Sequence, residues 1–195
     1  SVTGVQTCAL PILQSLLPSS AGAKPLIEAL PDEDWVTISQ QGLEPVTAGR
    51  FHVRNHVDDP VPPGLVPLLI PAGRAFGTGQ HETTGGCLQM LDRCRRTGAR
   101  FGNILDVGTG TGLLAFAALH LWPRALATAS DIDPAAVEVT AQNAALNGVA
   151  IGNGPGQLAL HVAAGTHHPA LHMRAPYDLV IANILAGPLV ELAPR

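Results

Sequence analysis

The chain has 195 residues, of which 46% are hydrophobic and 13% are charged, and its formal net charge is −4 at pH 7. This length suits one main domain, and the large apolar share excludes a disordered chain or a coiled coil. The negative charge argues against a broad nucleic-acid-binding face, which normally needs a basic surface.

The sequence also bears on membrane and metal binding. No apolar run reaches the roughly 18 residues of a membrane span, because "LLAFAAL" ends at His120 and prolines interrupt "LVPLLIP". The first cation is Lys24, so the charged start of a secretion signal is missing. The cysteines are Cys8, Cys87 and Cys94. Their spacing is not that of a metal site, and their number is not the even number expected of a set of disulfides. We expect a soluble, cytoplasmic protein with reduced cysteines, no metal and no membrane partner.

Residues 1–60 are predicted to form a remnant of a small N-terminal α+β domain followed by a linker. They are rich in Pro, Gly and Ser, with only short apolar runs such as "DWVTI" and "FHVRNHV", which indicate short strands and turns. Residues 1–12 fit no periodic pattern and resemble translated sequencing-adaptor sequence. We therefore assign residues 1–12 no role in the fold.

Residues 61–195 are predicted to form a second, larger domain. From residue 85 onward, helical and strand patterns alternate along the chain. The expected helices are 85–96, 112–122 and 134–148, and the expected strands are 103–107, 125–131, 157–163 and 177–185. Such alternation predicts an α/β fold with a doubly wound, mostly parallel sheet.

One basic cluster, comprising Arg93, Arg95, Arg96 and Arg100, follows the first of these helical stretches. Cations at the carboxyl end of a helix complement its dipole. We favour this interpretation over a nucleic-acid-binding patch.

A glycine-rich loop follows the first buried strand. In "NILDVGTGTGLLAFAALHL" the strand runs into Gly108, Gly110 and Gly112 and then into an apolar helix. Ligand groups could approach backbone N–H groups at the helix N-terminus, because glycine has no Cβ to block them. Position 113 is Leu, so the spacing is GxGxG rather than the dinucleotide GxGxxG, which disfavours a nicotinamide cofactor. The alternative is an ordinary tight turn.

Three carboxylates lie near this loop. In "ASDIDP", Asp133 precedes Pro134 and a helix, so its expected task is capping, and Asp131 is left free for a ribose. Asp106, two residues before the first glycine, could receive an ammonium group, or it could only tie down the loop. The combination suits S-adenosyl-L-methionine, which has an amino-acid end and a ribose but no pyrophosphate.

Asparagines end two further elements. "YDLVIANILAGPL" is an apolar strand ending in Asn183, with a helix expected near Pro188. Carboxyl ends of strands face the ligand crevice, and an amide oxygen there could accept an N–H of a reacting amine. The alternative is an asparagine that satisfies its own turn. Asn147, four residues after Asn143, is followed by Gly148 and is typical of a helix terminator.

The segments "AFGTGQHETT", "LDVGTGTGLLA", "DIDPAAVEVTAQNAALNG" and "YDLVIANILAGPL", in this order and spacing, resemble the ribosomal protein L-eleven methyltransferase family over about residues 65–195. The resemblance implies a seven-stranded class I methyltransferase domain behind a small N-terminal domain. It implies that S-adenosyl-L-methionine is used to methylate lysine and N-terminal amines of one protein of the large ribosomal subunit. A monomer without direct nucleic-acid contact is expected.

The resemblance also assigns residues 75–84 as a lid over the methionine end of the cofactor. Residues implicated there are Phe76, Gly77, Thr78, His81 and Thr83. His81 could take a proton from the amine or serve as a hydrogen-bonding strut. Thr83 and Thr84 are candidates for capping the following helix.

Two departures from the family pattern are expected to matter. Ile70 stands before Pro71 where the family shows an Asp-Pro-Gly-type turn, and about three of the seven strands would follow beyond Arg195. Alternatives to the amine methyltransferase are a non-catalytic fragment with a bare strand edge, a methyltransferase for ribosomal RNA or a glutamine amide, and a nicotinamide-dependent oxidoreductase.

Overall fold

The computed structural model describes residues 45–71 and 82–192. Its first element is a small three-stranded sheet with the order β1-β2-β3. β1 and β2 pair antiparallel, whereas β2 and β3 pair in parallel. The three strands are β1 (Val46–Ala48), β2 (Phe51–Arg54) and β3 (Val66–Leu69). The domain boundary expected at residue 60 thus falls between two strands of one sheet, and the strand expected at "DWVTI" lies outside the described residues.

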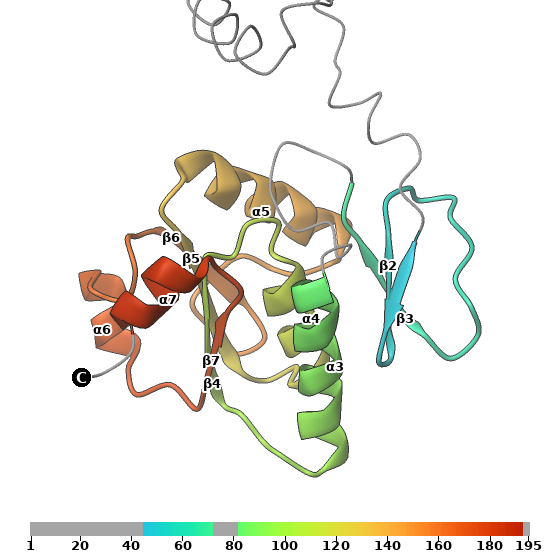
Figure 1. The fold of residues 1–195 in the computed structure, drawn as a ribbon, viewed down its shortest axis with the longest axis horizontal. Helices are drawn as coiled ribbons and strands as arrows, with labels where there is room; N and C mark the ends of the chain where they lie inside the picture. Colours follow the sequence, from blue (N-terminus) through green and yellow to red (C-terminus); the bar gives the residue numbers. More distant parts are fainter. Residues whose placement is uncertain (1–44, 72–81, 193–195) are drawn as a thin grey trace, which may run out of the picture. The chain divides into compact units, whose positions relative to one another are not determined.

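The main sheet has four described strands in the order β6-β5-β4-β7, and every neighbouring pair is parallel. Its strands are β4 (Asn103–Val107), β5 (Leu126–Asp131), β6 (Leu158–Val162) and β7 (Leu179–Ala182). Helices alternate with them: α3 (Glu82–Arg96), α4 (Leu113–Leu121), α5 (Pro134–Leu146), α6 (Pro169–Arg174) and α7 (Ala186–Leu192). Figure 1 shows α3 and α4 on one side of this sheet and α6 and α7 on the other. The predicted doubly wound α/β fold is confirmed.

The predicted and observed elements differ near the C-terminus. β7 ends at Ala182, so the last part of the strand expected at 177–185 is a turn and the start of α7. α7 begins two residues before Pro188, and α6 was not predicted. α6 is only six residues long, which is too short to show a helical period of apolar residues.

The core has one part on each side of β4, because side chains alternate between the two faces of a strand. Ile104 packs with α4 in the larger cluster, while Leu105 and Val107 pack with Leu171 of α6 in the smaller one. α4 is apolar on nearly its whole circumference and is buried from Leu113 to Leu119, as expected of a helix covered on all sides. Asp106 therefore points to the same face as Ile104, toward α3 and α4.

An ion pair joins the small sheet to α3. The carboxylate of Asp92, which is 5% exposed, accepts a hydrogen bond from Arg50 in the β1–β2 turn and lies 3.4 Å from Arg96 one turn along α3. A nearly buried carboxylate with two arginine partners is compensated for its loss of water.

No described helix is long and apolar enough to span a bilayer.

We expect Gly112→Ala to destabilise the fold far more than Gly148→Ala. Both glycines have positive φ, 85° and 66°, which strains any other residue by about 1–2 kcal/mol. A Cβ at Gly112 would also overlap the Phe116 ring and lie 2.8 Å from Thr140, whereas Gly148 has nothing within 4 Å. The predicted loss in the free energy of unfolding is about 2–5 kcal/mol for Gly112→Ala, against about 1–2 kcal/mol for the control. Equal losses in urea titrations would contradict this.

Candidate functional site

The candidate site lies where the strand order reverses, between β4 and β7. β4 is flanked by β5 on one side and by β7 on the other, and the last paired residues of the β4–β7 ladder are Val107 and Ala182. The next residues, Gly108 and Asn183, therefore leave neighbouring strands side by side. In open α/β sheets ligands bind beyond the carboxyl ends of the strands at such a point. We call this region the switch-point crevice.

The glycine loop touches the turn after β7. A Cβ at Gly108 would overlap Cγ2 of Ile184, and Gly108 has a φ of 69°. Only glycine combines this backbone conformation with so close an approach. The two segments that the sequence analysis selected separately are thus in direct contact.

Four backbone N–H groups of the loop have acceptors within the fold, whereas the approach of a ligand to the N-terminus of α4 stays a prediction. These N–H groups point back into the fold, because the left-handed glycines turn the loop over the end of β5. Gly108 and Thr109 donate to the Ser130 carbonyl at 2.8 and 3.0 Å, Gly110 donates to Asp131 at 3.0 Å, and Gly112 donates to the Thr109 carbonyl at 2.9 Å. The glycines serve conformation and close packing, and contact of Gly108, Gly110 and Gly112 with a cofactor stays a prediction.

Asp131 is less free than the sequence indicated. One of its oxygens accepts the N–H of Gly110 and the other accepts the N–H of Asp133, each at 3.0 Å. A carboxylate has about four acceptor sites, so lone pairs remain for hydroxyl groups. Asp133 accepts the N–H of Ala135 at 2.9 Å, with Pro134 in the first turn of α5. Its predicted capping role is confirmed.

Two polar side chains of α5 form hydrogen bonds with the loop from its outer side, and sequence reasoning missed them. Thr140 donates to the Gly110 carbonyl and Asn143 donates to the Thr111 carbonyl, each at 2.9 Å. Both side chains are at most 5% exposed. The available signal was their spacing of three residues, which places two polar groups on the sheet-facing side of the helix.

Asn147 does more than end a helix. It is the C-cap of α5 and Gly148 follows with positive φ, which confirms the predicted terminator. Its amide also forms two hydrogen bonds with the backbone of Leu69, accepting the N–H at 2.8 Å and donating to the carbonyl at 2.7 Å. The end of α5 is thereby joined to the end of β3.

Asp106 is 1% exposed and ties the loop to α4. It accepts the Thr109 hydroxyl at 2.8 Å and a backbone hydrogen bond from Ala115. Burial raises the pKa of Asp106 to about 7, the two hydrogen bonds oppose this shift, and the charge of Asp131 adds to it. Asp106 therefore ties down the loop, as one of the two interpretations of the sequence predicted, and its contact with an ammonium group remains a prediction. Burial and the nearby Asp106 also raise the pKa of the Cys87 thiol on α3.

Asn183 is held by the first turn of α3. Its Nδ2 donates to Oγ1 of Thr84 at 2.8 Å, and Thr84 is 2% exposed. Thr83 and Thr84 are the second and third residues of α3, so their prediction as caps preceding the helix is wrong. Thr84 instead joins α3 to the turn after β7.

Of the remaining predicted site residues, four lie outside the described residues: Phe76, Gly77, Thr78 and His81. The fifth, Thr83, is exposed at the start of α3. The part of the chain with defined structure holds no cluster of three or more His, Cys, Asp or Glu residues suited to a metal ion.

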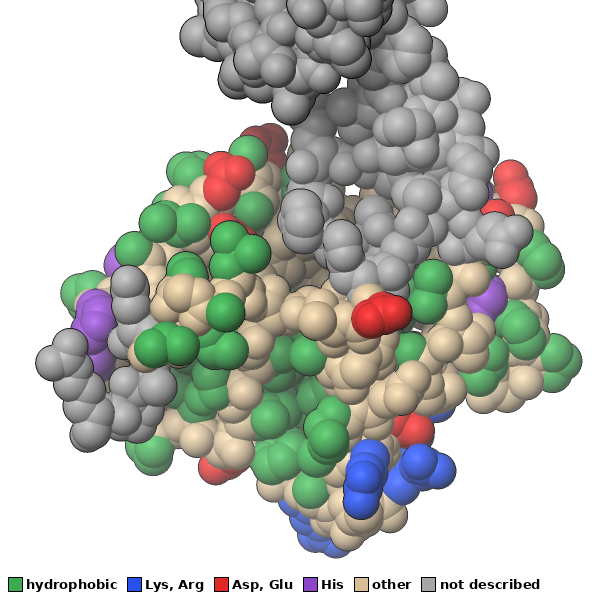
Figure 2. Space-filling model, in the orientation of Figure 1, with side chains coloured by type: hydrophobic (Ala, Val, Ile, Leu, Met, Phe, Trp, Pro, Cys, Tyr) green, Lys and Arg blue, Asp and Glu red, His purple; other side chains and the backbone are tan. Residues whose placement is uncertain are grey.

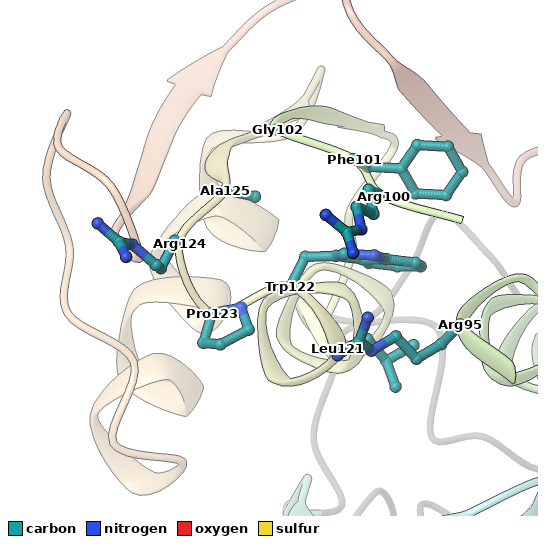
Figure 3. A pocket seen from close by; sticks show the side chains of 9 residues that line it. All are labelled: Arg95, Arg100, Phe101, Gly102, Leu121, Trp122, Pro123, Arg124 and Ala125. Atoms are coloured by element: carbon teal, nitrogen blue, oxygen red, sulfur yellow. The ribbon is translucent and has the colours of Figure 1, made fainter. Parts of the chain in front are cut away.

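A hollow of about 380 Å³ lies at the opposite end of the sheet, where Gly102 and Ala125 precede β4 and β5. Figure 3 shows Arg95, Arg100 and Arg124 around its rim, and Figure 2 shows basic side chains gathered at one end of the visible face. Three arginines occupy the last turn of α3, as predicted for the helix dipole: Arg93, Arg95 and Arg96. This hollow borders the amino ends of the strands and is not the candidate site.

We expect Asp106→Asn to change how stability depends on pH. The folded-state pKa of about 7 lies above the unfolded value of 3.8, so the contribution of Asp106 is greatest below pH 3.8 and is lost as the pH rises through 7. Wild type should therefore lose about 2–3 kcal/mol relative to Asp106→Asn between pH 5 and pH 8. Denaturant titrations at both pH values measure this difference. Parallel pH profiles for the two proteins would show that Asp106 does not titrate in this range.

The comparisons with known proteins agree with this geometry. A protein of Rhizobium etli (strain CIAT 652) named "Ribosomal protein L11 methyltransferase" is 47% identical over 174 residues, which is 89% of this chain and 57% of that protein. One of the same name from Brucella suis is 48% identical over 168 residues, covering 86% of this chain and 56% of that protein. The chain thus spans somewhat more than half the length of these curated relatives.

A solved structure is also similar. The crystal structure of a ribosomal protein L11 methylase from Lactobacillus delbrueckii subsp. bulgaricus matches with a TM-score of 0.56 and 30% identity, over 70% of this chain and 63% of that one. The family model described as "Ribosomal protein L11 methyltransferase (PrmA)" matches residues 8–195. With the glycine loop and the turn after β7 in contact at the switch point, the chain belongs to the ribosomal protein L11 methyltransferase family.

Proposed function

We propose that this protein transfers methyl groups from S-adenosyl-L-methionine to lysine side-chain and N-terminal amines of a large-subunit ribosomal protein. Family membership supports the reaction class. The observation that carries the proposal is the contact between the glycine loop and the turn after β7, which sets Asn183 beside the end of β4. Cofactor and substrate groups delivered to these two segments would meet at one point.

The residues of the crevice fit S-adenosyl-L-methionine better than a dinucleotide. A pyrophosphate needs N–H donors, and four N–H groups of the loop already have acceptors within the fold. The crevice offers acceptors instead, because Asp131 keeps lone pairs after receiving two N–H groups. Such acceptors suit the hydroxyl groups of a ribose. When bound, S-adenosyl-L-methionine supplies a methyl group activated by a positively charged sulfonium.

Asp106 is the proposed partner of the cofactor ammonium. Its carboxylate lies beneath the loop, beside Thr109 and the first turn of α4. A cation placed near it would stabilise the charged form and lower its pKa. Ligand binding near neutral pH should then release protons, which links the buried carboxylate to the cofactor even though Asp106 also ties down the loop.

Asn183 is proposed to orient the reacting amine. An unperturbed lysine amine titrates near pH 10.4, so the site must favour the neutral form. A neutral amide oxygen accepts an amine N–H without stabilising the ammonium form as strongly as a carboxylate would. Its work is alignment, and well-oriented reactants can recover about 7–11 kcal/mol of the barrier. His81 stays a candidate base, outside the described residues.

The cofactor assignment predicts a difference between two neighbouring carboxylates. Asp131→Asn should weaken S-adenosyl-L-methionine binding about tenfold or more, because Asp131 would receive the ribose and also holds Gly110. Asp133→Asn is the matched control, since Asp133 caps α5 and Asn is an equally good cap. Isothermal titration calorimetry with S-adenosyl-L-methionine and with a nicotinamide dinucleotide measures both affinities. Preferential binding of the nicotinamide would favour an oxidoreductase, and binding of neither would favour a non-catalytic fragment.

The role of Asn183 predicts loss of turnover without loss of cofactor. Asn183→Ala should lower methyl transfer by about 10²-fold, the scale expected when one aligning group is removed, and should leave the affinity for S-adenosyl-L-methionine unchanged. A labelled-methyl assay against purified ribosomal proteins measures the transfer, with ribosomal RNA as a competing substrate. Full turnover by Asn183→Ala would refute the role, and labelling of RNA alone would redirect the substrate assignment.

A further inference from the structure

We propose that the hollow at the amino ends of β4 and β5 is a docking surface for the phosphate backbone of RNA. Three segments of the chain meet there: the last turn of α3 with Arg95, the loop before β4 with Arg100, and the loop before β5 with Arg124. The switch-point crevice lies at the opposite, carboxyl end of the sheet, so RNA held at this hollow would leave the crevice open. The contact goes beyond the proposed methyl transfer.

The positive charge at this end of the sheet is local. Between Asp92 and Asp131 the chain has five arginines and a single carboxylate, that of Asp106. Asp106 is 1% exposed near the other end of β4, and Asp92 is already engaged by Arg50 and Arg96. A chain with a net charge of −4 thus has a cationic region, and such a local field attracts anions whatever the sign of the net charge.

The three guanidinium groups on the rim are unpaired. Within residues 45–71 and 82–192, the side chains of Arg95, Arg100 and Arg124 are exposed and form no ion pair or hydrogen bond. The carboxylate of Asp178 contacts the lining at Gly102, but its Oδ2 accepts two backbone N–H groups there. The dipole of α3 accounts for Arg95 in its last turn, whereas Arg100 and Arg124 lie in loops. These charges are left for a partner.

The floor of the hollow is held by the fold. Trp122 is 6% exposed, and its indole N–H donates to the Ala99 carbonyl at 3.0 Å. The ring of Phe101 packs edge-on against Trp122, with 4.7 Å between the ring centroids. The loop that carries Arg100 is thereby tied to the end of α4. A ligand therefore does not have to order this backbone when it binds, which lowers the entropic cost of association.

The layout of the charges suits an extended polyanion better than a single small ion. Figure 3 shows Arg95 and Arg100 reaching over the hollow from opposite sides of Trp122, while Arg124 points outward beyond Pro123. Guanidinium groups bind phosphate oxygens through paired N–H donors. Three such groups that do not converge on one point match phosphates in series along a backbone.

RNA is the polyanion that the proposed function brings near, and this choice rests on that function. The proposed substrate is a protein of the large ribosomal subunit, a particle that contains RNA. The amines of that substrate are positively charged at neutral pH before they bind, so the arginine rim repels them and does not serve as their binding site. The competing partner for the rim is an acidic protein segment.

The test measures binding of a fluorescein-labelled single-stranded oligouridylate by fluorescence anisotropy, without S-adenosyl-L-methionine. Three neutralised phosphates give a slope of about −2 for the logarithm of the binding constant against the logarithm of the salt concentration. Binding should therefore weaken about 16-fold between about 50 and 200 mM salt. Each of Arg95→Gln, Arg100→Gln and Arg124→Gln should lower the magnitude of the slope by about 0.7. The triple variant should bind at least tenfold more weakly at about 50 mM salt.

Arg93→Gln is the matched control. Arg93 is exposed on the same turn of α3 as Arg95, but residues two apart on a helix point to nearly opposite sides, and Arg93 does not line the hollow. The change in net charge is the same in both variants, so the control should keep the slope of the wild type. Urea titrations check that each variant is folded.

Three results would overturn the inference: equal slopes for Arg93→Gln and Arg95→Gln, no binding of the oligouridylate at about 50 mM salt, and tighter binding of a polyglutamate of equal charge. No step of the test needs methyl transfer. Failure to bind RNA therefore leaves the proposed function standing, whereas a protein that binds RNA but transfers no methyl group refutes only the proposed function.

Discussion

The closure of the glycine loop over the end of β5 is the constraint on which the candidate site depends. Two consecutive N–H groups, those of Gly108 and Thr109, converge on one carbonyl oxygen of Ser130, and Gly110 is fastened to the carboxylate of Asp131. The chain must turn sharply to form these hydrogen bonds, and only residues that tolerate positive φ allow such a turn. The same turn presses Gly108 against Ile184, so loop conformation and the contact across the switch point are set together.

Helices on two sides then hold this arrangement. α5 contacts the outer side of the loop through Thr140 and Asn143, which donate hydrogen bonds to two successive carbonyl groups of the loop. α3 reaches the opposite segment through Thr84 and Asn183. Buried polar side chains are costly unless paired, and here each pairing joins a helix to a segment of the crevice. Polar groups that would weaken an ordinary core instead specify one geometry.

The sequence predicted the main fold well because each element carried its own local signal. The apolar α4, the strand β4, and the Asp133-Pro134 cap of α5 could be recognised without tertiary information. Bonds between distant segments could not, since neither Thr84 nor Asn147 differs in local pattern from an ordinary cap or terminator. The same limit applies to Asp131. Its place at the end of β5 was predicted, whereas its two N–H partners depend on how the loop folds back. Propensity and spacing locate residues, whereas orientation needs the contacts.

The bond between Asn147 and Leu69 acquires a wider meaning beside the one between Asn183 and Thr84. One fixes the chain just before residues 72–81 and the other fixes it just after them. The entropy lost on closing a segment depends on bringing its two ends together. Here both ends are set by the fold itself, before any ligand binds. Asn147 thus fixes the end of β3 from the far end of a helix, without lying in the crevice.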